Sequence, residues 1–415
     1  MTLAAAGEPW ARIEEQLNSL KALDYRWEDG RLPSYVYFYS EEALEVQRRA
    51  YDAFIVENGL GEGKAFKSLS FLVQDVMRMS EPLFHTPRGG GSSFLSGGTE
   101  SLFMAMKAAR DYARSNRKGA IKKPNVVAPT SAHPAINKAG LLMDIDIRRV
   151  PVGPDFRADV QAIEDQIDED TLMIVASAPC FPYGVFDPIE ELGSLAERTG
   201  VWLHVDGCWG GFLSPFCERL GYSIPRWDFR VPGVSRLSAD IHKFGYGAKG
   251  ASLLVFRDAA LRAFHHFSHE WVRGVYESSS FAGSKPGGSV AAAWAVMKFM
   301  GIEGYLDAAR ITMATTHKLM DGIERIEGLK LGVTQRESNL IFFQSESADV
   351  DINAVAEAFG RRGWFVGRIK QPLGIHQGVN PVHAKIADKY IEELRDAVAE
   401  VRLSSARAIF DDRSY

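Results

Sequence analysis

The chain has 415 residues, of which 46% are hydrophobic and 24% charged, and its formal net charge is -5. This is the composition of a globular protein of roughly two or three domains, and the slight acidic excess argues against a nucleic-acid-binding surface. The three cysteines lack CxxC spacing, which argues against a disulfide framework and indicates reduced thiols inside a cell.

The first predicted elements are helices. Apolar residues with helical spacing predict a helix over residues 10–22, an arm that packs on another surface, and residues 41–55 predict a second helix. No stretch reaches the ~20 apolar residues that a membrane span needs, and the N-terminus lacks the basic and apolar segments of a signal peptide. We therefore expect a cytoplasmic protein.

Between about residue 56 and about residue 300, short apolar runs alternate with helical patterns. The helical patterns include 102–113 and 188–198, and the apolar runs are 126–128, 172–176, 201–205 and 252–256. This alternation predicts a mostly parallel sheet covered by helices, and therefore an α/β protein.

The last part of the chain predicts a smaller α+β domain. Its expected elements are a helix over 305–326, a strand over 338–343, a helix over 352–361, a strand over 364–369 and a helix over 381–404. We predict three regions: an N-terminal arm (1–55), a large domain (56–304) and a small C-terminal domain (305–415).

A lysine and an aspartate follow two of the predicted strands. Lys243 lies in the glycine-punctuated segment SADIHKFGYGAKG (238–250), and the apolar run VWLHVD ends on Asp206. This pair suggests pyridoxal phosphate, whose aldehyde a lysine binds as a Schiff base while an aspartate keeps the pyridine nitrogen protonated. Such a lysine must lose its proton, which burial beside other cations favours. The alternatives are a solvated surface lysine and an aspartate that caps the next turn.

Two segments nearer the N-terminus carry weaker signals. The glycines of SGGTES, before Thr99, allow close backbone approach at a helix start, where free N–H groups bind anions. An ordinary helix cap would look the same. His133, just after the apolar run at 126–128, is placed either to stack on a flat ring or to cap a helix.

Two later segments are also ambiguous. The glycine-, serine- and lysine-containing loop 281–288, preceded by Tyr276, is either a second anion site or a simple helix start. His265, His266 and His269 lie on a predicted helix or loop and lack the ligand spacing of a zinc site, so we predict no metal.

Taken together, these segments are similar to the pyridoxal-phosphate-dependent group II decarboxylase superfamily of fold type I, and within it to the sphingosine-1-phosphate lyases of the soluble bacterial type. The resemblance covers roughly residues 30 to 395. Its strongest parts are residues 96–101, 131–133, 177–188, 204–212, 240–250 and 283–288. Their order and spacing are specific as a set, and they imply that the large domain (56–304) binds the cofactor.

The resemblance implies a role for each matched residue. The expected cofactor contacts are Lys243 (covalent), Asp206 (ring nitrogen), His133 (ring stacking), and Gly98, Thr99 and His242 (phosphate). Gly283 and Ser284 match a loop that reaches the phosphate from the neighbouring subunit, which implies a homodimer with shared active sites. The expected substrate and proton-handling residues are Lys249, Tyr276, His133 and Tyr37, the last of which matches a tyrosine donated by the partner chain.

The implied activity is cleavage of the C2–C3 bond of sphingosine 1-phosphate by retro-aldol chemistry, giving a long-chain aldehyde and phosphoethanolamine and serving sphingolipid degradation. The chain departs from the family pattern at Lys67, Cys180, Gly207 and Lys285. None of these changes removes a group that the cofactor needs.

Two other functions stay open. One is an amino-acid decarboxylase of the same fold; Lys249, six residues after Lys243, distinguishes the lyase pattern from it. The other is a protein of this fold that has lost activity and serves as a binding partner, which the joint presence of Lys243, Asp206 and His133 disfavours.

Overall fold

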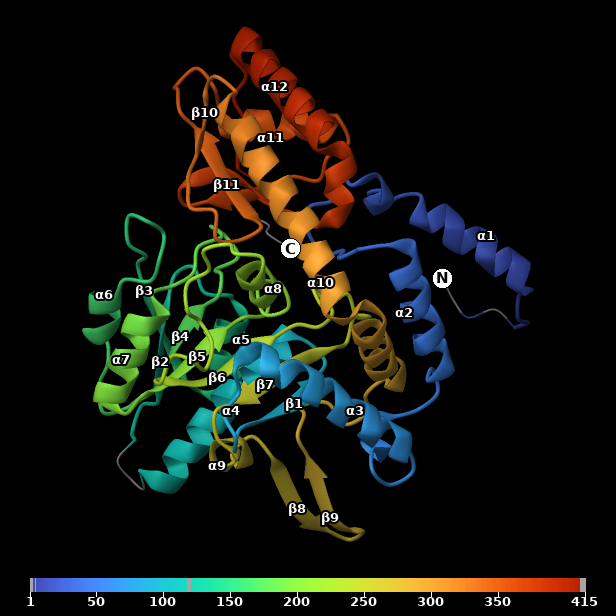
Figure 1. Ribbon diagram of the computed structural model, residues 1–415, viewed down its shortest axis with the longest axis vertical. Helices are drawn as coiled ribbons and strands as arrows, with labels where there is room; N and C mark the ends of the chain where they lie inside the picture. Colours follow the sequence, from blue (N-terminus) through green and yellow to red (C-terminus); the bar gives the residue numbers. More distant parts are fainter. Residues whose placement is uncertain (1–2, 4, 118–120, 411–415) are drawn as a thin grey trace.

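The computed structural model describes residues 3, 5–117 and 121–410 (Figure 1). The outermost residues of the predicted arm and of the predicted C-terminal domain therefore lie outside the described residues. The division at 55/56 and 304/305 stays a prediction.

A seven-stranded sheet, in the order β1-β7-β6-β5-β4-β2-β3, carries the larger part of the fold. Its strands are β1 (Gly91–Leu95), β2 (Asn125–Pro129), β3 (Asp146–Val150), β4 (Thr171–Ser177), β5 (Trp202–Asp206), β6 (Val234–Ala239) and β7 (Ser252–Phe256). β7 runs antiparallel to both of its neighbours, and the other strands are parallel to one another. Because β2, β4 and β5 are buried along their whole length, their apolar runs fit a sheet covered on both faces. The predicted α/β class is confirmed.

Helices cover both faces of this sheet. α4 (Gly98–Asn116) and α5 (Ala135–Met143) bury their apolar residues on one face. The other face is covered by α3 (Lys67–Ser80), α7 (Ile189–Thr199), α8 (Ser214–Arg219) and the first part of α10 (Gly287–Glu324). The remaining short helices are α6 (Val160–Glu164), α9 (Ala259–Ala263), η1 (Trp27–Asp29), η2 (Gly59–Gly61) and η3 (Glu81–Phe84).

A smaller unit with its own core follows. α10 leads into it and is kinked at Gly301, whose φ of +53° favours glycine. The unit holds the antiparallel sheet β10-β11-β13-β12 and three helices, so the predicted α+β character is confirmed. Its elements are β10 (Leu329–Leu331), β11 (Leu340–Ser345), α11 (Ile352–Arg361), β12 (Gly367–Lys370), β13 (Leu373–Gly378), η4 (Pro381–Ile386) and α12 (Ala387–Ser404).

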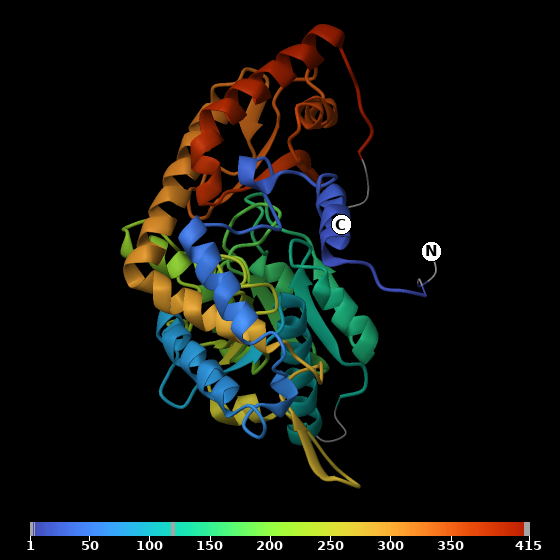
Figure 2. The same cartoon turned by 90° about the vertical axis from the view of Figure 1, so that its right-hand side faces the viewer.

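Two segments project from the body. α1 (Trp10–Lys21) stands away from it with every residue exposed, whereas α2 (Glu41–Ala53) packs along α10 (Figures 1 and 2). β8 (Phe267–Trp271) and β9 (Gly274–Ser278) form a hairpin below the large sheet (Figure 1). His269 therefore lies in a strand, and its prediction as helix or loop is wrong, because an exposed hairpin carries no buried apolar run to mark it.

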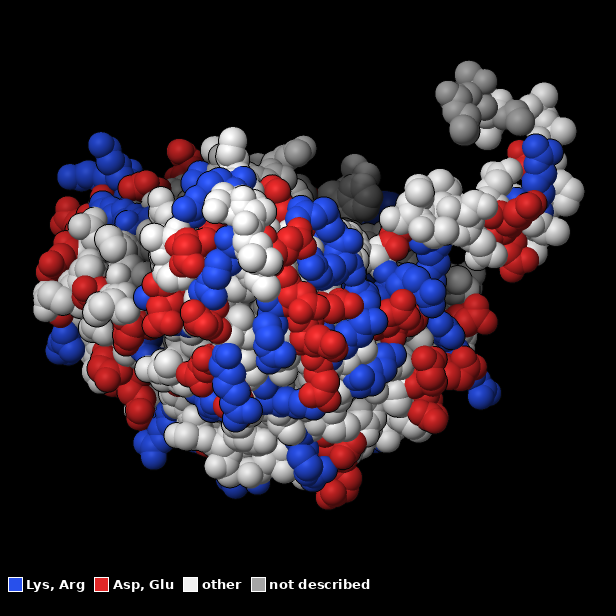
Figure 3. Space-filling view, turned by 90° about the horizontal axis from the view of Figure 1, so that it is seen from above, with Lys and Arg blue, Asp and Glu red and all other residues white. Residues whose placement is uncertain are grey.

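The surface agrees with the near-neutral charge. Basic and acidic side chains are interspersed over the face shown in Figure 3. Among the described residues, no helix combines the length and apolar character that crossing a membrane requires.

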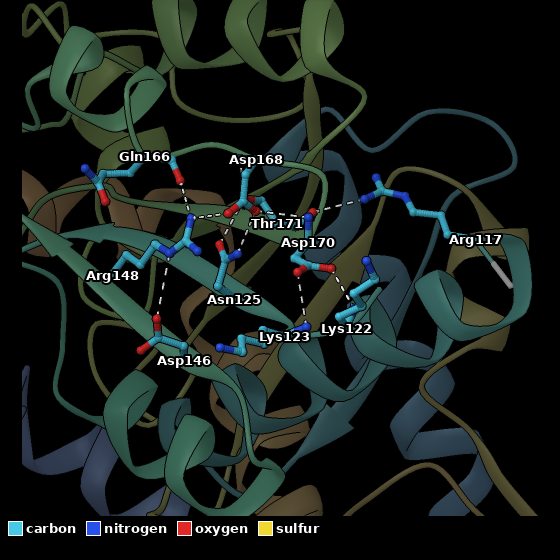
Figure 4. Close-up of polar contacts among 10 residues, drawn as sticks. All are labelled: Arg117, Lys122, Lys123, Asn125, Asp146, Arg148, Gln166, Asp168, Asp170 and Thr171. Carbon is cyan, nitrogen blue, oxygen red and sulfur yellow. Dashed lines mark hydrogen bonds and ion pairs between the residues drawn. The ribbon is translucent and has the colours of Figure 1, made fainter. Parts of the chain in front are cut away.

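A polar network closes the amino-terminal ends of β2 and β4, away from the strand ends discussed below (Figure 4). Asp168 accepts hydrogen bonds from Asn125 Nδ2 (2.9 Å) and Thr171 Oγ1 (3.1 Å) and pairs with Arg148 (2.7 Å). Burial acts to raise the pKa of Asp168, but these hydrogen bonds outweigh it and lower the pKa to about 2. The network fastens neighbouring strands and plays a structural role.

Candidate active site

A cavity of about 1170 Å³ opens at the carboxyl ends of the parallel strands, the edge where open α/β sheets bind ligands. Its walls come from the turn before α4, the segment after β2, the ends of β4, β5 and β6, the N-terminal segment around Tyr35, and residues 364–369 of the small unit. Segments far apart in the sequence therefore meet in one place.

Lys243 lies just after β6 and lines this cavity. Its Nζ is 3.0 Å from Oδ2 of Asp240; the Asp240 side chain is 2% exposed and the Lys243 side chain 24%. Burial acts to lower the pKa of Lys243, but the charge of Asp240 outweighs it and the pKa is raised. Burial thus eases proton loss as expected, but the charge of Asp240 overrides it. Sequence analysis missed Asp240, although an acidic residue following an apolar strand is the signal that identified Asp206.

Asp206 ends β5 and is 9% exposed. Within the described residues, both hydrogen bonds to its side chain end on Oδ1, from Cys208 N (3.1 Å) and Ser238 Oγ (3.2 Å). Asp206 therefore caps the next turn and also lines the cavity, and its contact with a ring nitrogen stays a prediction.

The turn at the start of α4 leaves no room for side chains. A Cβ at Gly98 would lie 2.7 Å from Cys208 Sγ and 3.0 Å from Asp240 Oδ2, and one at Gly97 would lie 3.3 Å from His242 Cε1. Gly98 and Thr99 line the cavity at the start of this 19-residue helix, where free N–H groups suit an anion.

Two side chains support this turn. His242 Nδ1 accepts a hydrogen bond from Ala251 N (3.2 Å), and burial lowers the pKa of His242 to about 4, so its ring is neutral. Glu100, which sequence analysis missed, accepts hydrogen bonds from Ser96 N (2.7 Å) and from Phe281 N (2.7 Å). Glu100 therefore ties the turn to the loop that follows β9.

His133 lines the cavity while its Nδ1 accepts a hydrogen bond from Ala135 N (3.1 Å) at the start of α5. The helix-cap alternative is thus observed, and stacking on a ring stays a prediction. Burial lowers the pKa of His133, which leaves a neutral ring suited to stacking. Arg149, also missed, holds the segment by donating to Pro129 O (2.7 Å) and Ala132 O (2.9 Å).

Lys249 is connected to the cavity by its contact with the ring of Tyr37. Its Nζ donates to His242 O (3.2 Å) and lies 4.5 Å from the centre of the Tyr37 ring, which lines the cavity. Although Lys249 is exposed, partial desolvation by its surroundings, reinforced by the charge of Lys243, lowers its pKa to about 8. This lysine is therefore a cation at neutral pH that loses its charge easily.

Four predicted residues do not line this cavity within one chain: Lys249, described above, and Tyr276, Gly283 and Ser284. Tyr276 lies on β9, and a Cβ at Gly283 would be 3.8 Å from its hydroxyl. Ser284 Oγ accepts a hydrogen bond from Asn58 Nδ2 (3.0 Å). Their predicted roles at the cofactor stay predictions.

The residues that do meet fit pyridoxal phosphate. Lys243 offers an amine for the aldehyde, Asp206 a carboxylate for the ring nitrogen, and the start of α4 a set of N–H groups for the phosphate. Two buried polar atoms of the cavity wall, Ser131 Oγ and Asp240 Oδ1, also lack a protein hydrogen-bond partner among the described residues. A polar ligand accounts for such atoms.

Comparisons with known proteins agree with this geometry. The family profile "Pyridoxal-dependent decarboxylase conserved domain" matches residues 69–346. The sphingosine-1-phosphate lyase of Oryza sativa is 38% identical over 94% of this chain and 73% of its own length, and the enzyme of Mus musculus is 36% identical over 96% and 70%. The solved sphingosine-1-phosphate lyase of Burkholderia pseudomallei superposes with a TM-score of 0.92 at 34% identity, covering 97% of this chain and 94% of that one.

Proposed function

The chain belongs to the pyridoxal-dependent decarboxylase family and, within it, to the sphingosine-1-phosphate lyases, and from this premise we propose that it cleaves the C2–C3 bond of sphingosine 1-phosphate or a related phosphorylated sphingoid base. The products are a long-chain aldehyde and phosphoethanolamine. The observation that carries the proposal is the meeting of Lys243, Asp206 and the turn before α4 in one cavity of a chain with this similarity.

Pyridoxal phosphate, when bound, supplies an aldehyde that bonds to an amine and a ring that accepts the electron pair of the broken bond. Lys243 would hold the aldehyde and Asp206 the ring nitrogen. His133 would cover the ring, and Gly98, Thr99 and His242 would hold the phosphate. These assignments follow from the geometry above and from the family pattern.

Asp240 orients the amine that binds the cofactor. Its Oδ2, 3.0 Å from Lys243 Nζ, keeps that amine protonated and directed into the cavity. The proton must leave before Nζ can act as a nucleophile, and Asp240 is the carboxylate in direct contact with it. Asp240 therefore positions the amine of Lys243 at the cavity wall.

The cavity suits a lipid with a charged end. Lys249 and Tyr37 supply a cation and a hydroxyl for the substrate phosphate. Other parts of the wall are apolar or aromatic: Tyr25, Phe181, Trp364, Phe365, Val366 and Ile369. At about 1170 Å³ the cavity also exceeds the ~300–1,000 Å³ of ordinary ligand pockets. These features favour a long-chain substrate over a small amino acid.

A homodimer with shared active sites is the second part of the proposal. Gly283 and Ser284 lie in a loop that Glu100 fastens beside the turn before α4, yet neither lines the cavity of their own chain. We propose that this loop and Tyr276 complete the site of a second copy. The cytoplasmic location also stays a prediction.

Mixing two inactive variants tests the sharing. Lys243→Ala removes the amine, and Ser284→Asp places a negative charge in the loop. If sites are shared, mixed dimers contain one intact site, and random exchange restores about a quarter of wild-type activity. If each chain builds its own site, the mixture stays inactive.

Product analysis tests the reaction. The protein, loaded with pyridoxal phosphate, is incubated with sphingosine 1-phosphate, with unphosphorylated sphingosine, and separately with amino acids. The proposal predicts equimolar aldehyde and phosphoethanolamine from the phosphorylated base and none from Lys243→Ala. Carbon dioxide from an amino acid, with no aldehyde from the lipid, would establish the decarboxylase instead.

A further inference from the structure

A row of polar side chains continues from the cavity into the protein core, beneath Asp206. β5 and β6 pair in a register that places His204 opposite Arg236 and Asp206 opposite Ser238. Because side chains alternate along a strand, these four lie on the same face of the sheet. Trp202 shares this face and packs in the core beneath α4 and α5.

Arg236 is an unusual member of this row because it is fully buried and forms no ion pair within the described part of the chain. Its Nη2 donates to Met173 Sδ (2.8 Å), and its guanidinium lies 4.4 Å from the centre of the Trp202 ring. Its Nε and Nη1 have no hydrogen-bond partner there. Burying a cation without a carboxylate is costly, so packing alone is a poor reason for an arginine at this position.

The hydrogen bonds of Ser238 fix where the protons are. Its Oγ lies 3.2 Å from Asp206 Oδ1, 3.4 Å from His204 Nε2 and 3.2 Å from Cys208 Sγ. A hydroxyl has one proton to donate, and an ionised carboxylate only accepts. The proton of Ser238 therefore goes to Asp206, and the hydroxyl oxygen accepts from His204 Nε2–H and from the Cys208 thiol.

His204 must then carry its proton on Nε2 and none on Nδ1. Nδ1 has no hydrogen-bond partner among the described residues. Burial, followed by the charge of Arg236, lowers the pKa of His204 well below its ordinary value, so the ring is neutral and holds a single proton. The positive charge of Arg236 disfavours a second proton on the His204 ring. Nε2–H therefore remains the donor to Ser238 Oγ.

We propose that His204 and Ser238, with Arg236 opposite His204, form a buried relay that positions Asp206, tying Oδ1 so that Oδ2 faces the cofactor ring nitrogen. The relay touches neither substrate nor cofactor, so its members are positioning residues. The inference rests on the proposed function in one respect, the assignment of Asp206 to the ring nitrogen.

Two relay variants and one control test it. Ser238→Ala removes the hydroxyl with little change in shape, and Arg236→Met replaces the buried cation with an apolar chain of similar length. Leu237→Val is the matched control, because Leu237 is a buried neighbour on the opposite face of β6. For each protein we would measure the dissociation constant of pyridoxal phosphate, the visible absorption band of the bound cofactor, the melting temperature without cofactor, and kcat and KM.

We expect Ser238→Ala to bind pyridoxal phosphate about 10- to 100-fold more weakly, the fold-change for loss of a hydrogen bond to a charged group. Arg236→Met removes no hydrogen bond to Asp206 and should weaken binding less. Their cofactor band should shift and kcat should fall, while KM stays within about twofold. Leu237→Val should lower only the melting temperature. The relay is overturned if Ser238→Ala keeps the dissociation constant, band and kcat of the wild type.

Ser238→Ala decides the matter by itself if Arg236→Met does not fold. Failure of the proposed substrate would look different. The wild type would then release no aldehyde but would still bind pyridoxal phosphate, and the affinity and band of the variants would still test the relay.

Discussion

The contact between Lys243 and Asp240 predicts a large and specific effect of Asp240→Asn on the cofactor-free protein. Two unit charges 3.0 Å apart interact by about 5 kcal/mol at an effective dielectric constant of about 20. The free energy of unfolding that Asp240→Asn removes has an upper limit, because Lys243 can instead release its proton, at a cost of about 4 kcal/mol at pH 7.5. Since the Lys243 side chain is 24% exposed, partial solvation lowers the expected loss to about 2–4 kcal/mol.

A double-mutant cycle measures this coupling. Free energies of unfolding from urea titrations of cofactor-free wild type, Asp240→Asn, Lys243→Met and the double variant should give a coupling of about 2–4 kcal/mol, because the double variant leaves no unpaired charge. Arg26 and Asp29, an exposed pair of the same spacing at 3.3 Å, provide the control cycle, with a coupling below about 1 kcal/mol. Additive effects at positions 240 and 243 would refute the reasoning.

Three further predictions concern charge and packing. Because Lys249 has a pKa of about 8 and is a cation below it, KM for the phosphorylated substrate should rise as pH increases through 8, and Lys249→Arg, which stays charged, should flatten this rise in steady-state assays. Gly207→Ala should lower stability by about 1–3 kcal/mol in urea titrations, because its Cβ would lie 2.8 Å from Ser238 O and 3.0 Å from Trp227 Cζ3; an unchanged midpoint would contradict this. The folded pKa of Asp168 is lowered to about 2, so its contribution is present above the unfolded value of about 3.9 and is lost as pH falls through 2. Because the Asp168 side chain is partly exposed, we reduce that contribution to about 1 kcal/mol. Asp168→Asn should remove this part of the acid dependence of the melting temperature. An unaltered dependence of the melting temperature on acid pH would count against the prediction.

The sequence predicted the buried parallel strands well because such strands are continuous apolar runs. β2, β4, β5 and β7 all lie where the runs at 126–128, 172–176, 201–205 and 252–256 predicted them. β3 and β6 escaped because they carry charged residues, Arg236 among them, and the hairpin β8–β9 escaped because it is exposed. A continuous apolar run, rather than burial itself, is therefore what made a strand predictable, since β1 (GSSFL) is buried along its whole length and was also missed.

The residues of the candidate site also fall into those that a local sequence pattern predicted and those that it missed. Lys243, Asp206, His133 and the turn at Gly98 were predicted, since each stands next to a strand or helix end, and all of them line one cavity. Asp240, Glu100 and Arg149 act through contacts that only the folded chain brings together. The role proposed for Gly283 and Ser284 requires a second copy of the chain, which no local pattern can position.

Identification of the cofactor-binding lysine tests the central claim most directly. The protein loaded with pyridoxal phosphate would be reduced with borohydride, which makes the bond between lysine and cofactor permanent, and its peptides would be analysed by mass spectrometry. The account predicts the cofactor mass on Lys243 and its absence from Lys249, six residues further along the same loop. Cofactor attached at Lys249, or at no lysine of this segment, would contradict it.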